Sequence, residues 1–345
     1  MDKKKLITSL VFIIIVGAVI ISLTVSKKSY AVGTTLVDTV KALNKGSSWS
    51  AGASGVYYTN SHEYRYIGAE VNNYVKFNND LYRIIGVFDS NSHGVTGTEL
   101  VKLIRARSLG GYSWGAYNTD NSAGTYSGYA NDWTGKSKTS KANLNVLFNE
   151  YFYNKTDTSS TYGDCANWTY YFSDNSYKTK DCSDIITYGI DSSLRGYIET
   201  ATWYLYGSGT DKSKQNWYIC ERGGNSCTPS GPSTGDTSVT SKVGLMYLSD
   251  YLYASGYYAS TDTTTQGQYY FGNKNWLYKG WEWTLTPYAS GTSYGWLVSI
   301  GHAGSGYSSA PFGSRPTFYL KSSVYVTGGD GSFDDPYTLG CDNCS

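Results

Sequence analysis

The chain has 345 residues, enough for one large domain or two ordinary ones, and only 16% of them are charged. Its 28 Lys and Arg balance 27 Asp and Glu, which excludes the basic surface that nucleic-acid partners require. With 36 Tyr and 39 Gly, the composition suits an exported protein with many short strands and long polar loops.

The N-terminal segment has the pattern of an export signal. Lysines at residues 3–5 precede an uncharged apolar run long enough to span a bilayer as a helix. Small residues ending at Ala31 form a candidate cleavage site, so residues 1–31 are either a signal peptide or a permanent signal anchor. Both interpretations place the remaining chain outside the membrane, secreted or anchored. The anchor positions are Leu6, Phe12, Ile15, Ile20 and Val25.

The remaining chain reads as a tether followed by one domain. Residues 32–60 are small and polar, and we expect a flexible tether there. Residues 61–340 are predicted to form a single extracellular domain, and 341–345 a short tail. No internal repeat or second domain boundary is recognisable after residue 60.

The first predicted strands form a hairpin. Val75 and Phe77 alternate with polar residues, turn formers follow at 78–80, and residues 81–88 are rich in β-branched and aromatic side chains. The stretch "ELVKLIRARSL" predicts a third strand. Residues 110–135, which lack any period, predict a long surface loop.

Two amphipathic helices are expected in the middle of the chain. The first has Leu144, Leu147, Phe148 and Tyr151 on one face, with Thr139 or Ser140 as its N-cap. The second lies in "SSLRGYIETATWYL", where Leu194, Tyr197, Ile198 and Ala201 repeat the spacing. Residues 207–240 are predicted to be loop.

The last third returns to strands. In "WEWTLTP", Trp281, Trp283 and Leu285 share one face, and Glu282, Thr284 and Thr286 share the other. One apolar and one polar face predict a half-buried antiparallel strand with both tryptophans in the core. The stretches "GWLVSIG" and "SRPTFYLKSSVYV" predict further strands.

These elements predict an α+β domain with a mainly antiparallel sheet, two helices and long loops, preceded by one hydrophobic N-terminal helix. The ordered blocks "NNYVKFNNDLYRIIGVF", "VKLIRARSLG", "ERGG", "GLMYLSDYLYA", "WEWTLTP" and "RPTFYLKSSVYVTGGDGSFDDPY" resemble an uncharacterised family of secreted or anchored surface proteins of Gram-positive gut bacteria. More distantly, the closing strands are similar to the C-type-lectin and formylglycine-generating-enzyme type of fold. That resemblance implies long loops on a small antiparallel core, and no particular function.

The six cysteines fall into near-neighbour couples. An even number in an exported chain favours disulfides, and local pairing is the expected arrangement. These bridges would pin loops rather than hold the fold together. The couples are Cys165 with Cys182, Cys220 with Cys227, and Cys341 with Cys344.

Candidate catalytic and metal-binding patterns are weak. His62, His93 and His302 have no metal-ligand spacing, and each is expected at the surface or in a turn. The strongest catalytic hypothesis combines His302 with Glu282 or Asp250 and a serine. No Gly-x-Ser-x-Gly nucleophile motif supports it. We therefore predict no catalytic residue, no metal ligand and no cofactor.

Two other stretches raise binding hypotheses. Asp330, Asp334 and Asp335 gather in a glycine-rich stretch that either binds Ca²⁺ or is an ordinary turn. Arg315 is expected to pair with a core carboxylate. The Tyr-rich stretches at 110–135 and 250–271 have the chemistry of adaptable binding loops, or are simply a polar surface.

The function that fits best is a non-enzymatic binding or adhesion domain with a glycan or protein ligand at the cell surface. The alternatives are an exported hydrolase acting on glycan or cell wall, and a structural surface component.

Overall fold

The computed structural model describes most of the chain after residue 32. The described ranges are 33–46, 54–59, 62–117, 129–130, 133, 143–155, 169–171, 177–179, 183–207, 214–223, 228–229, 237–255, 275–288, 294–299, 302–308 and 310–344. The apolar run at 6–25 and Ala31 lie outside these residues. Among the described residues, no helix is long and apolar enough to cross a membrane.

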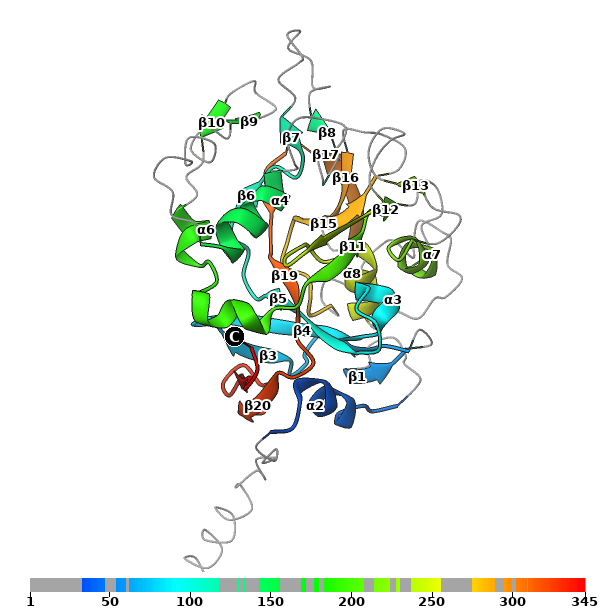
Figure 1. Ribbon diagram of the computed structural model, residues 1–345. Helices are drawn as coiled ribbons and strands as arrows, with labels where there is room; N and C mark the ends of the chain where they lie inside the picture. Colours follow the sequence, from blue (N-terminus) through cyan, green and yellow to red (C-terminus); the bar gives the residue numbers. More distant parts are fainter. Residues whose placement is uncertain are drawn as a thin grey trace, which may run out of the picture. The chain divides into compact units, whose positions relative to one another are not determined.

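The larger sheet is eight-stranded and branches at its longest strand (Figure 1). On one side of β4 (Asp80–Phe88), strands β2 (Tyr64–Ile67) and β3 (Tyr74–Phe77) pair with different parts of it. On its other side β4 pairs with β5 (Leu100–Arg105). The sheet is completed by β1 (Gly55–Tyr58) beside β2, β19 (Thr317–Leu320) beside β5, and β21 (Tyr337–Gly340) and β20 (Tyr325–Gly328) beyond β3.

A second sheet has five strands. Its order is β17 (His302–Tyr307), β16 (Tyr294–Ser299), β15 (Glu282–Pro287), β18 (Phe312–Gly313) and β6 (Gly111–Tyr112). Two-stranded ribbons join β11 (Ala201–Tyr204) to β14 (Ser238–Ser241), β12 (Tyr206–Gly207) to β13 (Thr228–Pro229), β9 (Thr169–Tyr171) to β10 (Tyr177–Thr179), and β7 (Ala116–Tyr117) to β8 (Tyr129–Ala130). The mixed α+β class with mainly antiparallel pairing is confirmed; the parallel pairs are β3 with β21 and β15 with β18.

Local sequence explains the first hairpin, which forms as predicted. Asn78 and Asn79 take left-handed conformations, with φ of 55° and 57°, as a two-residue hairpin turn requires. Further along β4, Gly86 lies under β2. A Cβ at this position would stand 2.3 Å from the backbone oxygen of Tyr64, so only glycine lets β2 approach.

The helices are short. Among the described residues the α-helices are α2 (Leu36–Ala42), α3 (Ser90–His93), α4 (Asn143–Val146), α6 (Ser183–Thr187), α7 (Lys214–Cys220) and α8 (Leu248–Ala254). The predicted helix around Leu144 is confirmed, although it continues beyond α4 as a π-helix, Leu147–Tyr153. Its apolar face is buried, as its spacing requires. The proposed caps Thr139 and Ser140 lie outside the described residues.

The second predicted helix is wrong. Residues Ser192–Tyr197 form only a 3₁₀ turn, and the chain then enters β11, where Ala201 and Trp203 are fully buried. Burial of Trp203 through strand pairing outweighs the helical spacing of the apolar residues. The predicted loop at 207–240 is also wrong in part, because α7 and β14 lie within it.

The prediction of a flexible tether at residues 32–60 is wrong where the chain forms α2 and β1. Thr35 caps α2 by accepting a hydrogen bond from the Asp38 backbone N–H at 3.0 Å. Apolar side chains of α2, including Leu36 and Val40, are buried, and the Leu36 N–H donates to Val324 O at 2.8 Å. Figure 1 shows α2 beside β20. A small number of apolar residues within a polar stretch is therefore enough to attach it to the domain.

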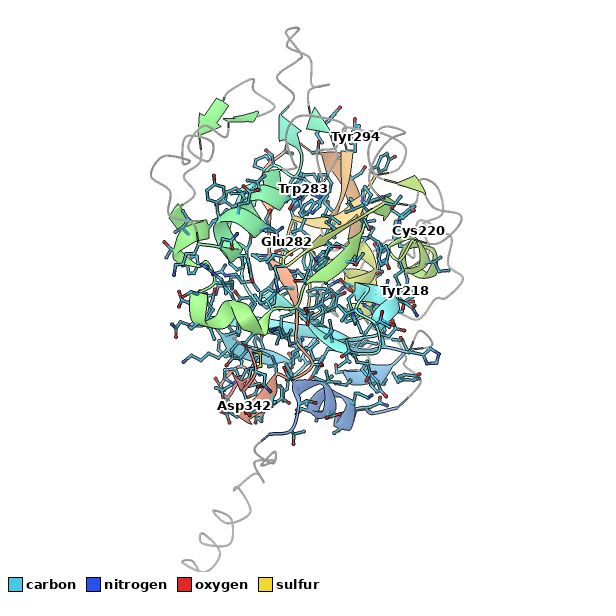
Figure 2. All side chains as sticks on the ribbon, viewed as in Figure 1. Tyr218, Cys220, Glu282, Trp283, Tyr294 and Asp342 are labelled. Carbon is cyan, nitrogen blue, oxygen red and sulfur yellow. A yellow bond between two sulfur atoms is a disulfide. The ribbon has the colours of Figure 1, made fainter. Side chains whose placement is uncertain are left out.

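Only one tryptophan of "WEWTLTP" is in the core. Trp283 is 1% exposed and lies in the interior (Figure 2), whereas Trp281 is 47% exposed and stacks on Phe312 with ring centroids 5.4 Å apart. The expected wet face is absent, because Glu282 and Thr284 are also buried. Strand β15 is covered on both sides, so alternation of residue type does not report exposure there.

Three aromatic side chains of the predicted loop at 110–135 also point inward. Tyr112, Trp114 and Trp133 are fully buried, and the Trp114 indole donates to Thr284 O at 2.8 Å. The start of the Tyr-rich stretch at 250–271 belongs to α8, with Tyr251 and Tyr253 buried. The remainder of that stretch lies outside the described residues.

The contrast between the two tryptophans is testable. Trp283→Ala should lower the free energy of unfolding by about 3–5 kcal/mol, through lost burial and a cavity. Trp281→Ala should cost only about 1 kcal/mol, since it loses one exposed ring stack. Urea denaturation measures both, and equal losses would contradict the assignment.

Candidate functional site

A network of buried charges lies where the larger sheet meets α7 and α8. Arg65 of β2 donates from Nε and Nη2 to Glu63, at 3.0 and 2.7 Å, and from Nη1 to Asp250 of α8 at 3.1 Å. Lys102 of β5 donates to the other oxygen of Asp250 at 2.6 Å. Arg222, directly after α7, donates to Glu63 at 3.0 Å. Side chains of Glu63, Arg65, Lys102 and Asp250 are at most 1% exposed.

Neutral donors complete this ion network. Ser92 and Tyr218 both donate hydroxyl hydrogen bonds to Glu63, and the Tyr247 N–H donates to Asp250 at 2.9 Å. The carboxylates therefore have the additional partners that make a buried ion pair tolerable.

Aromatic rings enclose the cations of the network. Lys102 Nζ lies 4.5 Å from the ring centre of Tyr247 and 5.4 Å from that of Trp203. The Arg65 guanidinium lies 4.6 Å from Phe88 and 4.7 Å from Tyr253. Cation–π attraction offsets part of the cost of removing these charges from water.

The neighbouring cations keep both carboxylates ionised. Burial raises the pKa of Glu63, but Arg222 and Arg65 outweigh it, and the pKa lies below its ordinary value. For Asp250, burial is likewise outweighed by Lys102 and Arg65, which lower its pKa.

Glu221 behaves differently. This side chain is fully buried and accepts from the Ser249 N–H at 3.3 Å and from the Thr286 hydroxyl. Burial raises its pKa to about 7, helped by the charge of Asp250. Glu221 is therefore a buried acid that gains or loses its proton near neutral pH.

Both carboxylates considered as partners of His302 already face cations. Glu282 accepts from Arg315 at 2.6 Å, which confirms the core pairing expected for Arg315, and Asp250 belongs to the ion network. His302 begins β17 rather than lying in a glycine turn. These contacts give both carboxylates cationic partners within the core.

The surface expectation for His93 is wrong. Its ring is fully buried against Tyr319, with Nε2 donating to Phe88 O at 3.1 Å and Nδ1 accepting from the Val95 N–H at 3.2 Å. His62 is exposed, as expected, and contacts the Tyr58 hydroxyl.

A pocket of about 360 Å³ opens between three segments that are distant in sequence. We call it the Phe333 pocket. One wall is the 69–72 turn with Tyr74 of β3 and Arg83 of β4, a second is the 275–279 segment before β15, and the third is Phe333. The lining residues are Ala69, Glu70, Val71, Asn72, Tyr74, Arg83, Asn275, Trp276, Tyr278, Lys279 and Phe333.

Hydrogen bonds hold the walls of the pocket in place. The Trp276 N–H donates to Gly68 O at 2.9 Å, and its indole donates to Tyr66 O at 2.7 Å. Asn275 donates to Tyr251 O at 2.8 Å, which attaches the second wall to α8. The pocket is therefore preformed, as small-molecule sites usually are.

The acidic stretch near the C-terminus builds the third wall. Asp330 accepts from the Ser332 N–H at 2.9 Å, and Ser332 Oγ accepts from the Asp335 N–H at 3.0 Å. These bonds describe a closed turn whose tip presents Phe333, 63% exposed, edge-on to Tyr74 at 5.5 Å. In the part of the chain that the structure describes, no three His, Cys, Asp or Glu side chains gather as metal ligands.

Cysteine positions are described only in part. Cys341 and Cys344 form a disulfide, in agreement with their expected pairing. Cys220 is also disulfide-bonded. Cys165, Cys182 and Cys227 lie outside the described residues, so the other expected pairs stay predictions.

Comparison with protein-family models, with curated proteins and with solved structures finds no match to this chain. Function must therefore be argued from the site itself.

The buried acid gives stability a distinctive pH dependence. A raised folded-state pKa contributes stability that is present below the unfolded pKa and lost as pH rises through the folded one. For Glu221 this window runs from 4.5 to about 7. Across it, the stability of the parent relative to Glu221→Gln should fall by roughly 2–3 kcal/mol.

The measurement is denaturant unfolding of both proteins at several pH values. The comparison cancels His93, whose pKa is lowered by burial and whose effect has the opposite sign. A stability difference that stays constant from pH 5 to 8 would show that Glu221 does not hold this proton.

Proposed function

We propose that the chain is a non-enzymatic binding domain outside the cell membrane and that it binds its ligand in the Phe333 pocket. The observation that carries the proposal is the convergence of Tyr74, Trp276, Tyr278 and Phe333 on one preformed concavity, beside Arg83 and Lys279. Aromatic walls with a few polar groups are typical of ligand sites. Phe333 is also the most exposed large apolar side chain among the described residues.

The exposure of the Phe333 ring is explained by the turn that carries it. The 330–335 turn orders itself through its own hydrogen bonds and holds Phe333 against Tyr74 instead of burying it. A rigid aromatic residue at a pocket rim provides contact area at low entropic cost. This supports recognition by a preformed surface rather than by the Tyr-rich stretches alone.

The proposed location rests on the sequence. The apolar run from Leu6 to Val25 is proposed to anchor the domain outside the cell, unless cleavage after Ala31 releases it. The Cys341–Cys344 disulfide supports an oxidising compartment. Protease added to intact cells should degrade the domain, and resistance until lysis would contradict this location.

The finer fold assignment is also a proposal. Short helices and long connections around antiparallel sheets are consistent with the C-type-lectin type of fold. That arrangement serves binders and enzymes alike, so the pocket and not the fold carries the functional argument.

The proposal is tested by binding of the full chain to glycan and mucin arrays. Phe333→Ala should reduce binding to the preferred array spots by about tenfold, because the ring lies at the rim and its loss removes contact without a core cavity. Tyr307→Ala, an exposed aromatic of β17 with 47% exposure, is the matched control and should bind like the parent. Loss of binding in the control but not in Phe333→Ala would place the site elsewhere.

A further inference from the structure

We propose that the Phe333 pocket selects a sugar ring that carries a carboxylate, such as a uronic or sialic acid. This inference rests on the proposed binding function and names the ligand class. The inference follows from the charged groups and hydrogen-bond donors of the pocket. The aromatic walls alone would not distinguish one ligand class from another.

Arg83 is a buried cation with donors to spare. Its guanidinium carbon lies over the rings of Tyr74 and Trp276, 4.1 and 4.5 Å from their centres. Nε donates to Asn73 at 2.7 Å, Nη1 to Trp276 O at 3.2 Å and Nη2 to Val71 O at 3.1 Å. Arginine has five N–H groups, so one remains on each terminal nitrogen. A fixed guanidinium with remaining N–H groups suits a carboxylate.

The acceptors of Arg83 are all neutral, so its charge is not cancelled locally. Burial lowers its pKa to about 10, and the nearby Arg315 acts in the same direction. Lys279, at the exposed edge of the pocket, also has a lowered pKa, because of burial and repulsion by Arg83 and Arg315. An anion entering the pocket would relieve this repulsion.

Glu70 is the exception among the charged lining residues. It is exposed, whereas Arg83 is buried, so the cationic group lies deeper than the carboxylate. A ligand with an acid group at one end and hydroxyls elsewhere can meet Arg83 with the acid and donate hydroxyl hydrogen bonds to Glu70. A purely apolar carboxylate would form no hydrogen bonds with Glu70 and Asn72, which would stay paired with water instead.

The remaining lining suits a ring. Phe333 and Tyr278 offer apolar faces, and the volume of about 360 Å³ is at the small end of the usual range of ligand pockets. That size fits one or two rings. An acidic sugar therefore matches the pocket in charge, hydroxyl partners and size.

The experiment is calorimetric titration of the full chain in mild detergent with glucuronic acid and N-acetylneuraminic acid. Glucose, the methyl ester of glucuronic acid, and glucose 6-sulfate are the comparison probes. The free acids should bind at least about tenfold more tightly than glucose or the ester, because only they place a charge near Arg83. Their affinity should fall with added salt.

Variants at exposed positions avoid unfolding. Lys279→Gln should weaken the acids about fivefold and leave glucose unchanged, while Lys45→Gln, the matched control that removes the same charge from an exposed lysine outside the pocket lining, should not weaken them. If glucose binds as tightly as the free acids, the proposed acid selectivity is wrong, although the proposed binding function is not contradicted. Tighter binding of the sulfate, or of a peptide C-terminus used as a further probe, would assign another anion. No binding of any sugar would overturn the inference, and array binding that survives Phe333→Ala would separately overturn the proposed function.

Discussion

The buried ion network is the constraint on which the rest of the structure depends. Glu63 and Asp250 bring Arg65, Lys102 and Arg222 together from β2, β5, and the end of α7. Each element would leave an uncompensated charge in the interior if it were misplaced, which is far more costly than a lost apolar contact. The network therefore selects one arrangement of sheet and helices, even where its net contribution to stability is small.

The pocket inherits its geometry from the same elements. The turn that follows β2 donates from the Gly68 N–H to Ala254 O at 2.9 Å, which ties it to α8. Tyr251 of α8 in turn accepts from Asn275. The 69–72 and 275–279 walls of the Phe333 pocket are therefore both attached to α8, which the ion network holds in place. The proposed binding pocket therefore depends on α8 for its shape.

Much of the strand pattern could be read from the sequence, because turn residues and alternation act locally. Asn78 and Asn79 identify the hairpin turn, and Arg315, expected to pair with a core carboxylate, does so with Glu282. The helix predicted around Ser192 does not form. Its spacing could not show that Trp203 is buried in a strand that pairs with β14. Burial of Glu282 is not predicted by alternation, because β15 is covered on both faces, and Trp281 is exposed just before this strand begins.

The site was largely invisible in the sequence. Glu63 and Asp250 are 187 residues apart in the sequence, and no motif connects them. The acidic turn was recognisable, but its role in presenting Phe333 depends on Tyr74, which reaches it through the pairing of β3 with β21. Long-range packing of this kind has no local signature.

The most direct test of the central claim is a double-mutant cycle of Asp250→Asn and Lys102→Met, measured by denaturant unfolding. If the network fixes the fold, Asp250→Asn alone should cost about 3–5 kcal/mol, since Lys102 then stays buried without its counter-charge. Adding Lys102→Met should recover a substantial part of that loss, giving a coupling energy above about 1 kcal/mol. Single substitutions that each cost less than about 1 kcal/mol and simply add would contradict the account.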